Sequence, residues 1–142
     1  MQQIKVHTAG QSALCPQTPA PSAALAVFGA SGDLTHRKLL PSLFQLFKSK
    51  LLSEQFYLLG IARKKFDDQQ FRQTAEQAIQ TSLSDTDQKQ LDAFTQKLYY
   101  ISGDYDDPSF YNDIKNRLSE LDNTHSVDNC RLFYLAVPPA FG

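Results

Sequence analysis

The feature that most constrains the fold is an apolar run that ends in a glycine-rich turn and continues into an amphipathic helix. Residues 27–41 read Val-Phe-Gly-Ala-Ser-Gly-Asp-Leu-Thr-His-Arg-Lys-Leu-Leu-Pro. Gly29 and Gly32 have no Cβ, so the backbone can turn sharply and bring its N–H groups against a pyrophosphate, at a helix start that adds positive charge. Ser31 and Leu34 replace two glycines of the common Gly-x-Gly-x-x-Gly pattern. The sequence still predicts a phosphate-binding turn.

The rest of the chain alternates between expected strands and expected helices. Apolar runs predict strands at residues 23–28, 56–61, 99–103 and 132–137, and the stretches between them carry apolar residues at helical spacing. Continuous apolar runs are typical of parallel strands that helices cover on both faces. The order predicts an α/β fold, a doubly wound, Rossmann-like parallel sheet with strand order 3-2-1-4.

Local signals place the helices between these strands. The first carries Leu40, Leu43, Phe44 and Phe47 on one face, and Pro41 must lie in its first turn or kink it, because proline has no N–H. A capping box of Asp67 and Gln70 starts the second, and a third is expected from near Ser84 or Asp85 through Leu91, Phe94 and Leu98. Asp107 and Pro108 begin the last, whose buried stripe is Phe110, Ile114, Leu118 and Leu121.

Composition indicates one domain and excludes several classes of partner. The 142 residues are 42% apolar and carry 14 basic against 15 acidic side chains, and we expect neither a nucleic-acid nor a membrane partner. Cys15 and Cys130 lie far apart without clustered histidines, so neither a disulfide scaffold nor a metal site is expected, and the setting is taken to be the reducing cytosol. Residues 1–22 read as a disordered tail, and residues 23–142 as the folded domain.

Three segments resemble one family in the order that the family requires. They are Gly29-Ala30-Ser31-Gly32-Asp33-Leu34 with Arg37-Lys38-Leu39 and Pro41, then Gly60-Ile61-Ala62-Arg63, then Arg131 to Pro139 with the sequence Arg-Leu-Phe-Tyr-Leu-Ala-Val-Pro-Pro. The first is similar to the coenzyme loop of the glucose-6-phosphate dehydrogenase family. The second resembles the end of that family's second strand, and the third its fourth strand and following loop.

The end of the second expected strand bears on the choice of coenzyme. A ribose 2′-hydroxyl calls for a carboxylate there, and a 2′-phosphate for a guanidinium. Arg63 is followed by Lys64 and Lys65, with no acid before Asp67, so NADP is favoured over NAD. The resemblance also implies an arginine at this position; whether Lys64 and Lys65 take part is left open.

The resemblance further implies roles for the glycine-rich turn and for three residues outside it. All six residues of the turn, from Gly29 to Leu34, are expected to bind coenzyme, with Asp33 capping the helix or fixing the loop. Asp104 and Tyr105 match the loop that flanks the adenosine, where the Tyr105 ring offers a stacking surface; a plain turn before Asp107 is the alternative. Lys38 matches a lysine near the sugar-phosphate or coenzyme phosphates, with a solvated charge as the alternative.

An activity also follows from the resemblance. The family oxidises glucose 6-phosphate at C1, passes a hydride to NADP and forms the 6-phosphogluconolactone, the first step of the oxidative pentose phosphate pathway. Its histidine base lies in an Asp-His-Tyr-Leu-Gly-Lys segment, and an Glu-Lys-Pro-Phe-Gly strand end also contributes; neither string occurs in these residues. The chain is therefore expected to be the N-terminal coenzyme-binding portion of a cytoplasmic enzyme, with no catalytic residue of its own and inactive alone.

Two other functions remain as alternatives. One is a non-catalytic dinucleotide-binding or sensor module. The other is a short-chain reductase or epimerase, whose Tyr-x-x-x-Lys pair Tyr111 and Lys115 match in spacing but precede the fourth strand. The histidines His7, His36 and His125 are expected to be exposed surface residues. The strand expected at residues 132–137 is apolar on both faces, so its outer edge is expected to be covered by a neighbouring copy, as in a homo-oligomer, or by other segments.

Overall fold

The computed structural model describes residues 23–52, 55–127 and 131–136. The expected tail, His7, both cysteines and the expected strand end at Val137 to Pro139 lie outside these residues. The elements in chain order are β1 (Ala24–Phe28), η1 (Thr35–Leu39), α1 (Leu40–Lys48), β2 (Tyr57–Ala62), α2 (Asp68–Ser82), α3 (Gln88–Thr95), β3 (Leu98–Ser102), α4 (Pro108–His125) and β4 (Arg131–Leu135).

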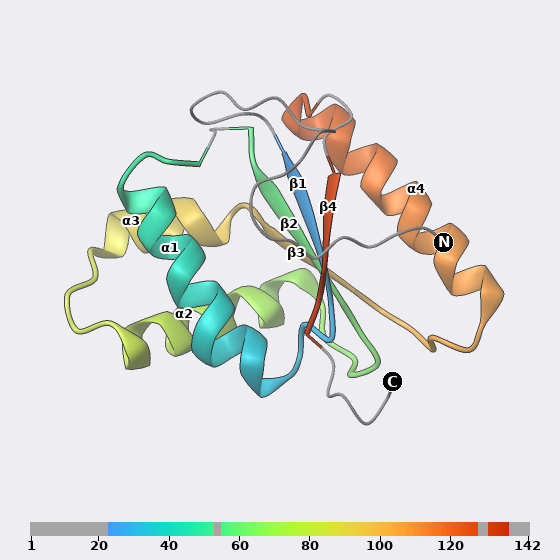
Figure 1. The fold of residues 1–142 in the computed structure, drawn as a ribbon, viewed down its shortest axis with the longest axis horizontal. Helices are drawn as coiled ribbons and strands as arrows, with labels where there is room; N and C mark the ends of the chain where they lie inside the picture. Colours follow the sequence, from blue (N-terminus) through green and yellow to red (C-terminus); the bar gives the residue numbers. More distant parts are fainter. Residues whose placement is uncertain (1–22, 53–54, 128–130, 137–142) are drawn as a thin grey trace.

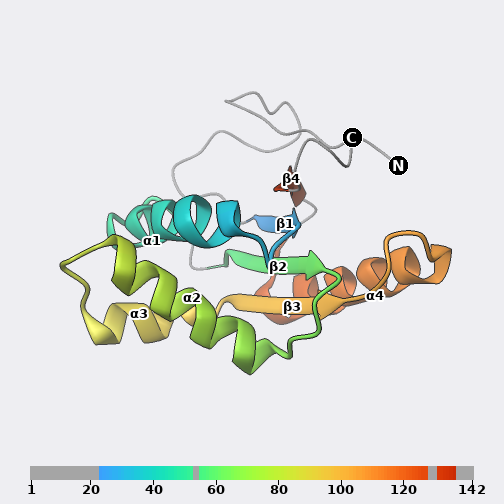
Figure 2. The same cartoon turned by 90° about the horizontal axis from the view of Figure 1, so that it is seen from below.

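The four strands form one parallel sheet in the order β3-β2-β1-β4, which confirms the predicted doubly wound topology. Ala24 of β1 lies opposite Tyr57 of β2 and Arg131 of β4, so the three strands start at one level. Figure 1 shows α1, α2 and α3 on one face of the sheet and α4 on the other, and Figure 2 shows the strands side by side between these layers. All carboxyl ends therefore meet at one edge, where ligands bind in folds of this kind.

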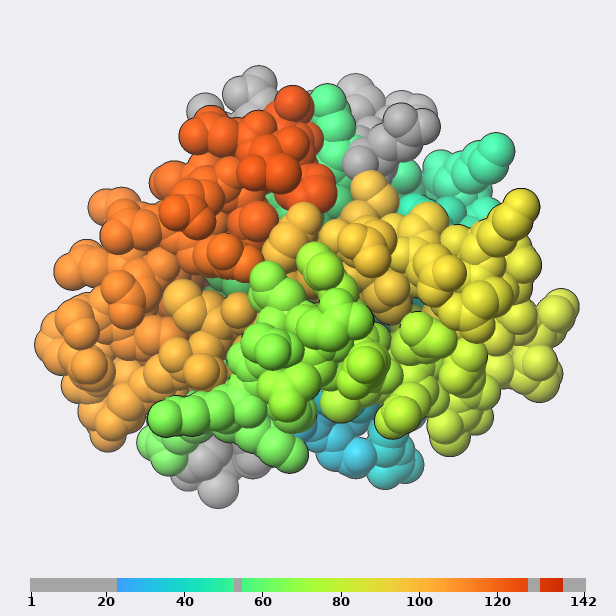
Figure 3. Space-filling view, turned by 180° about the vertical axis from the view of Figure 1, so that it is seen from behind, coloured from blue at the N-terminus to red at the C-terminus, as the bar shows by residue number. Residues whose placement is uncertain are grey.

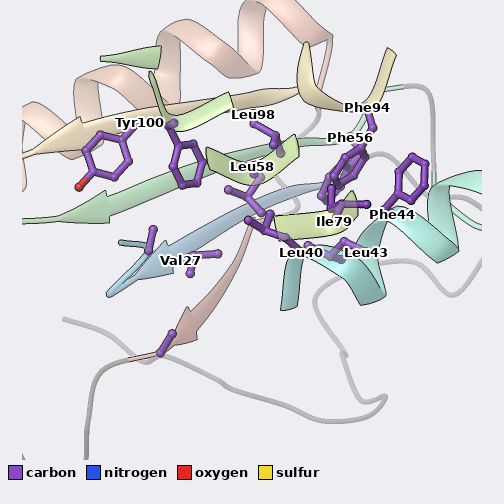
Figure 4. Packing of buried hydrophobic residues seen from close by; sticks show 14 of the residues in the cluster. Val27, Leu40, Leu43, Phe44, Phe56, Leu58, Ile79, Phe94, Leu98 and Tyr100 are labelled. Carbon is purple, nitrogen blue, oxygen red and sulfur yellow. The ribbon is translucent and has the colours of Figure 1, made fainter. Parts of the chain in front are cut away.

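Each face of the sheet has its own hydrophobic core. The first core packs the sheet against α1, α2 and α3, and the ring centroids of Phe44 and Phe94 lie 5.6 Å apart at one end of it (Figure 4). The second packs the opposite face against α4 through the predicted stripe of Phe110, Ile114, Leu118 and Leu121, each at most 4% exposed. Because helices pack on both faces of the sheet, side chains on both sides of a strand are apolar, and the strand sequences are nearly continuous apolar runs.

Most local signals act as predicted, but the third helix does not. Asp67 and Gln70 form both hydrogen bonds of the capping box, and the Asp107 carboxylate caps α4 ahead of Pro108. The helix expected from Ser84 or Asp85 through Leu98 instead begins at Gln88 and ends at Thr95, and Leu98 is the first residue of β3. Leu98 is fully buried opposite Leu58 in the sheet, so strand pairing overrides the helical spacing.

The first helix contains a wide turn that the sequence did not predict. Residues 35–39 are π-helical, with the N–H of Leu40 donating to the carbonyl oxygen of Thr35, five residues back. Pro41 then lies in the first turn of α1, as predicted, where its missing N–H costs little. The π-helical residues lead into α1 without a break, and Pro41 is the second residue of α1.

The two outer strands differ in how their edges are covered. Side chains of α2 cover β3, since Asp68 accepts the N–H of Tyr100 at 2.8 Å and Arg72 donates to the carbonyl oxygen of Leu98 at 2.8 Å. Atoms of α2, α3 and α4 fill this side of the molecule in Figure 3. On β4, by contrast, Leu132 and Leu135 are 42% and 47% exposed. What covers β4 remains a prediction.

Candidate functional site

The glycine-rich turn is fastened to the end of β2. Gly29 has a φ of 85°, in the left-handed region that glycine adopts without steric cost. The N–H groups of Gly29 and Ala30 both donate to the carbonyl oxygen of Ile61, at 2.8 and 3.2 Å, and the N–H of Gly32 closes the turn on the oxygen of Gly29 at 3.0 Å. Three amides of the expected phosphate cradle are thus used to shape the turn.

The next residues offer the amides that an anion could use. Helical residues begin at Asp33 and Leu34, and the first N–H groups of a helix have no partner within it. Asp33 does not cap this helix; its carboxylate accepts from Arg37 at 2.9 Å in an exposed ion pair. Leu34 is 43% exposed and Lys38 is exposed one turn further on. The turn therefore presents backbone donors with a lysine on the same exposed helix.

The turn can approach β2 closely because Gly60 has no side chain. A Cβ at Gly60 would lie 2.8 Å from the Cβ of Ala30 and 3.0 Å from the ring of Phe71. Close contact between turn and strand is what places Gly29 and Ala30 within reach of Ile61. Gly60 belongs to a segment that carries the family resemblance. Its packing role depends on Ala30 and Phe71, which lie outside that segment, and was not predicted.

Tyr100 of β3 contacts both the segment after β2 and the glycine-rich turn. The Tyr100 hydroxyl donates to the carbonyl oxygen of Lys64 at 2.6 Å. Burial raises the pKa of Tyr100 to about 12, against an opposing hydrogen bond with Ser31. The Ser31 hydroxyl, expected to reach a phosphate oxygen, is therefore in contact with a tyrosine of β3.

Tyr105 holds the turn through its hydroxyl. This hydroxyl accepts the N–H of Gly29 at 3.0 Å and donates to the carbonyl oxygen of Ile61 at 3.1 Å. The Tyr105 ring packs edge-on against Phe28, and burial raises the pKa of the hydroxyl. The sequence predicted a stacking surface for adenosine, and the structure adds a role in positioning the turn that spacing alone could not reveal.

An open cleft of about 570 Å³ lies at the carboxyl ends of β2 and β3, and none of the described residues that line it comes from the glycine-rich turn. It brings together the predicted residues Arg63 and Asp104. Among the described residues, its lining comprises Arg63, Lys65, Ser102, Gly103, Asp104 and Asp106. The Arg63 guanidinium carbon lies 6.0 Å from the centre of the Tyr105 ring. The cleft therefore has a cationic lip from β2 and an acidic lip from the loop after β3.

The structure separates the three cations that follow β2. Arg63 and Lys65 line the cleft, whereas the Nζ of Lys64 lies 5.0 Å from the centre of the Phe66 ring. The chain bends at residues 63–64 directly after β2. Lys65 is thus a second cation of the cleft, and Lys64 is not among its lining residues.

Two histidines are not the exposed surface residues that the sequence predicted. His36 is half-buried, with Nδ1 3.0 Å from the carbonyl oxygen of Gly32 and Nε2 3.1 Å from the Thr74 hydroxyl. His125 ends α4 rather than lying in a loop, and its Nε2 is 2.7 Å from the Tyr99 hydroxyl. Their partners lie in other elements, so sequence spacing gave no sign of them.

Comparison with known proteins identifies the family. The family model described as "Glucose-6-phosphate dehydrogenase, NAD binding domain" matches residues 26–142. The chain belongs to the glucose-6-phosphate dehydrogenase family. The match to its NAD binding domain makes a nicotinamide dinucleotide the ligand class of the site, in agreement with the turn and cleft at the carboxyl edge.

Relatives with that family name are similar over most of this chain. Glucose-6-phosphate 1-dehydrogenase of Chlamydia pneumoniae is 43% identical over 122 residues, 85% of this chain and 24% of the relative. The Bacillus subtilis enzyme is 36% identical over 121 residues, with the same two shares. The chain thus spans about a quarter of the length of these relatives.

Solved structures of glucose-6-phosphate dehydrogenases share the fold. One in complex with its substrate glucose-6-phosphate has a TM-score of 0.77 at 29% identity and covers 88% of this chain and 26% of its own. The Mycobacterium avium enzyme has a TM-score of 0.71 at 26% identity, covering 85% of this chain and 25% of its own. Within the described residues of the present chain, no helix has the length and apolar character needed to cross a membrane.

Proposed function

We propose that this protein is the NADP-binding part of a glucose-6-phosphate 1-dehydrogenase and that residues 23–142 form the coenzyme domain. Bound NADP would supply the hydride acceptor for oxidation of glucose 6-phosphate at C1. The observation that carries the proposal is the position of Arg63, which lines the cleft directly after β2 and lies over the ring of Tyr105, whose hydroxyl contacts Gly29 of the turn. A cytoplasmic location and assembly into a homo-oligomer belong to the same proposal, supported by the family resemblance.

Each part of the site has a separate task in coenzyme binding. The helix start at Asp33 and Leu34 binds the pyrophosphate through backbone N–H groups, with Ser31 at its side. Arg63 binds the 2′-phosphate, because a guanidinium can form two parallel hydrogen bonds with phosphate oxygens. Lys38, exposed on η1, is placed to reach a phosphate beyond the turn.

The carboxylates that line the cleft bear on the choice between NADP and NAD. Asp104 and Asp106 line the same cleft as the two cations, and a carboxylate there would suit the free ribose hydroxyls of NAD. One oxygen of Asp104 already accepts the N–H of Asp106 at 3.0 Å. The two cations and the engaged carboxylate favour a phosphate between the lips.

The test compares Arg63→Ala with Lys64→Ala in the full-length protein, with NADP and NAD titrated by calorimetry. Arg63→Ala should weaken NADP binding by roughly 1.5–3 kcal/mol and leave NAD binding little changed, because a charge-assisted pair is lost. Lys64→Ala removes a neighbouring cation that does not line the cleft and should change neither. Equal losses for both coenzymes with Arg63→Ala would show that Arg63 is structural, and tighter binding of NAD by the wild type would refute the choice of NADP.

A second measurement addresses the activity. A protein of residues 1–142, supplied with glucose 6-phosphate and NADP, should form no NADPH above background, because binding the coenzyme does not provide a base opposite the sugar. Turnover by pure protein of this length would contradict that expectation. Full-length protein that binds NADP but does not oxidise glucose 6-phosphate would support a non-catalytic binding module instead.

A further inference from the structure

We propose that His36 is a positioning residue that orients the backbone amide of Asp33 toward the coenzyme pyrophosphate and ties it to α2. The inference rests on the proposed function, since it concerns how the same turn is held for its ligand. His36 lies in η1, immediately after the turn, and its ring is half-buried against Phe71 at a centroid distance of 6.2 Å.

The first step is the hold on Gly32. Nδ1 of His36 lies 3.0 Å from the Gly32 carbonyl oxygen, and the backbone N–H of His36 donates to the same oxygen at 3.3 Å. A carbonyl oxygen can only accept, so Nδ1 carries the hydrogen of this contact. Two donors from one residue therefore fix the direction of the Gly32 carbonyl.

The second step follows from the planarity of the peptide bond. The carbonyl of Gly32 and the N–H of Asp33 belong to one peptide group, and in a trans peptide they point in opposite directions. A carbonyl held along the helix toward His36 leaves the Asp33 N–H directed away from the helix body, out of its N-terminal end. That is the direction from which a pyrophosphate approaches a helix start.

The third step is the anchor on α2. With the hydrogen on Nδ1, Nε2 of His36 is an acceptor, and the Thr74 hydroxyl lies 3.1 Å from it. The single hydrogen of that hydroxyl is shared between Nε2 and the carbonyl oxygen of Phe71, which lies 2.9 Å from the Thr74 oxygen. Thr74 is 38 residues from His36 in sequence. Because both ring nitrogens lie within hydrogen-bond distance of a partner, the imidazole links the turn to a helix whose own start is capped by Asp67.

Side chains of η1 thus hydrogen-bond to two carbonyl groups of the turn, those of Gly29 and Gly32. Thr35, fully buried, donates through its hydroxyl to the carbonyl oxygen of Gly29 at 3.3 Å, and His36 holds that of Gly32. Glycine gives the turn its shape but leaves its backbone flexible, so neighbouring side chains must restrict it. A pre-ordered donor loses less entropy when the anion binds.

The test measures two ligands on four variants of the full-length protein. NADP carries the pyrophosphate, whereas adenosine 2′-monophosphate carries only the ribose phosphate. His36→Ala should weaken NADP about 5- to 10-fold, the value of one lost orienting hydrogen bond, and leave adenosine 2′-monophosphate within about 2-fold. His36→Asn keeps a donor near the position of Nδ1 and should recover most of the NADP affinity.

Two threonine variants test the anchor on α2. Thr74→Val should weaken NADP binding less than His36→Ala does. Thr81→Val is the matched control, because the Thr81 hydroxyl also bonds a carbonyl oxygen of α2, and it should leave NADP binding unchanged.

The outcomes separate this inference from the proposed function. Equal weakening of both ligands by His36→Ala, or no recovery in His36→Asn, would show that His36 only supports the fold and would overturn the inference. Unchanged NADP affinity in His36→Ala would overturn it as well. Wild-type protein that binds neither ligand would instead refute the proposed function, and the inference with it.

Discussion

The two ends of the parallel strands both carry polar clusters, but only one cluster is closed. At the amino end, where β2 and β4 begin beside the end of α4 (Figure 1), the Tyr57 hydroxyl donates to Asp122 at 2.6 Å. Arg131 donates to the other oxygen of Asp122 at 2.6 and 3.1 Å. At the carboxyl end Arg63 and Lys65 face an open cleft. The sheet thus has an ion pair at its amino end and two cations lining an open cleft at its carboxyl end.

From this difference we expect the polar residues at the amino end to support the fold and those at the carboxyl end to bind ligand. Burial raises the pKa of Tyr57 and the bond to Asp122 raises it further, so the hydroxyl stays protonated and keeps its donor role. A buried polar group that keeps its hydrogen-bond partners hardly lowers the free energy of unfolding, whereas one that has lost them lowers it substantially. Substitutions at the amino end should therefore affect folding, and those at the carboxyl end ligand affinity.

The largest effect is expected at the closed end. Asp122→Ala should lower the free energy of unfolding by about 3 kcal/mol, because it leaves Arg131 and the Tyr57 hydroxyl without their shared acceptor. Asp106→Ala, a matched loss of one carboxylate at the cleft, should change it by less than about 0.5 kcal/mol. Urea unfolding of both variants measures the difference. Equal losses would break the distinction between the two ends.

How far the sequence predicts this molecule depends on the range of the interaction. The capping box at Asp67 and the Asp107 cap were predicted because each is complete within four residues, and the apolar runs predicted the strand order through general rules of chain connection. Arg63 was predicted because strand ends meet at one edge of a parallel sheet.

The rest of the site depends on contacts that local patterns cannot contain. The Tyr105 hydroxyl reaches Gly29 across 76 positions, and no spacing rule connects them. Leu98 fits a helical period as well as a strand, and only its pairing with Leu58 decides. The different surroundings of Lys64 and Lys65 likewise follow from where Phe66 and the cleft lie.

A smaller effect is expected for Tyr105, which supports both fold and site. Tyr105→Phe keeps the ring but removes the hydroxyl that accepts from Gly29 and donates to Ile61. We expect a loss of stability of about 1 kcal/mol and a weakening of NADP of similar size, because the turn loses one of its fixed points. Thermal unfolding with and without NADP measures both. Loss of affinity for Tyr105→Phe as large as for removal of the whole ring would place the ligand contact on the hydroxyl itself.

The smallest effect is a pH dependence at the closed end. Burial lowers the pKa of His125 from its usual 6.5, and the nearby Lys97 lowers it further. The unfolded chain then takes up the proton first as pH falls, so this contribution is complete above about pH 6.5 and is lost below it. His125→Gln should reduce the loss of stability between about pH 7 and about pH 5 by less than about 0.5 kcal/mol, allowing for solvent screening. A steeper dependence in the variant would reverse the assigned sign.

The most direct test of the central claim is a map of where NADP binds. Amide chemical shifts of the isotope-labelled full-length protein would be recorded as NADP is added. The account predicts changes at the glycine-rich turn from Gly29 to Leu34, after β2 at Arg63 to Lys65, and in the loop at Asp104 and Asp106, while Tyr57, Asp122 and Arg131 stay unchanged. Changes centred on those three residues, or none at the turn, would contradict it.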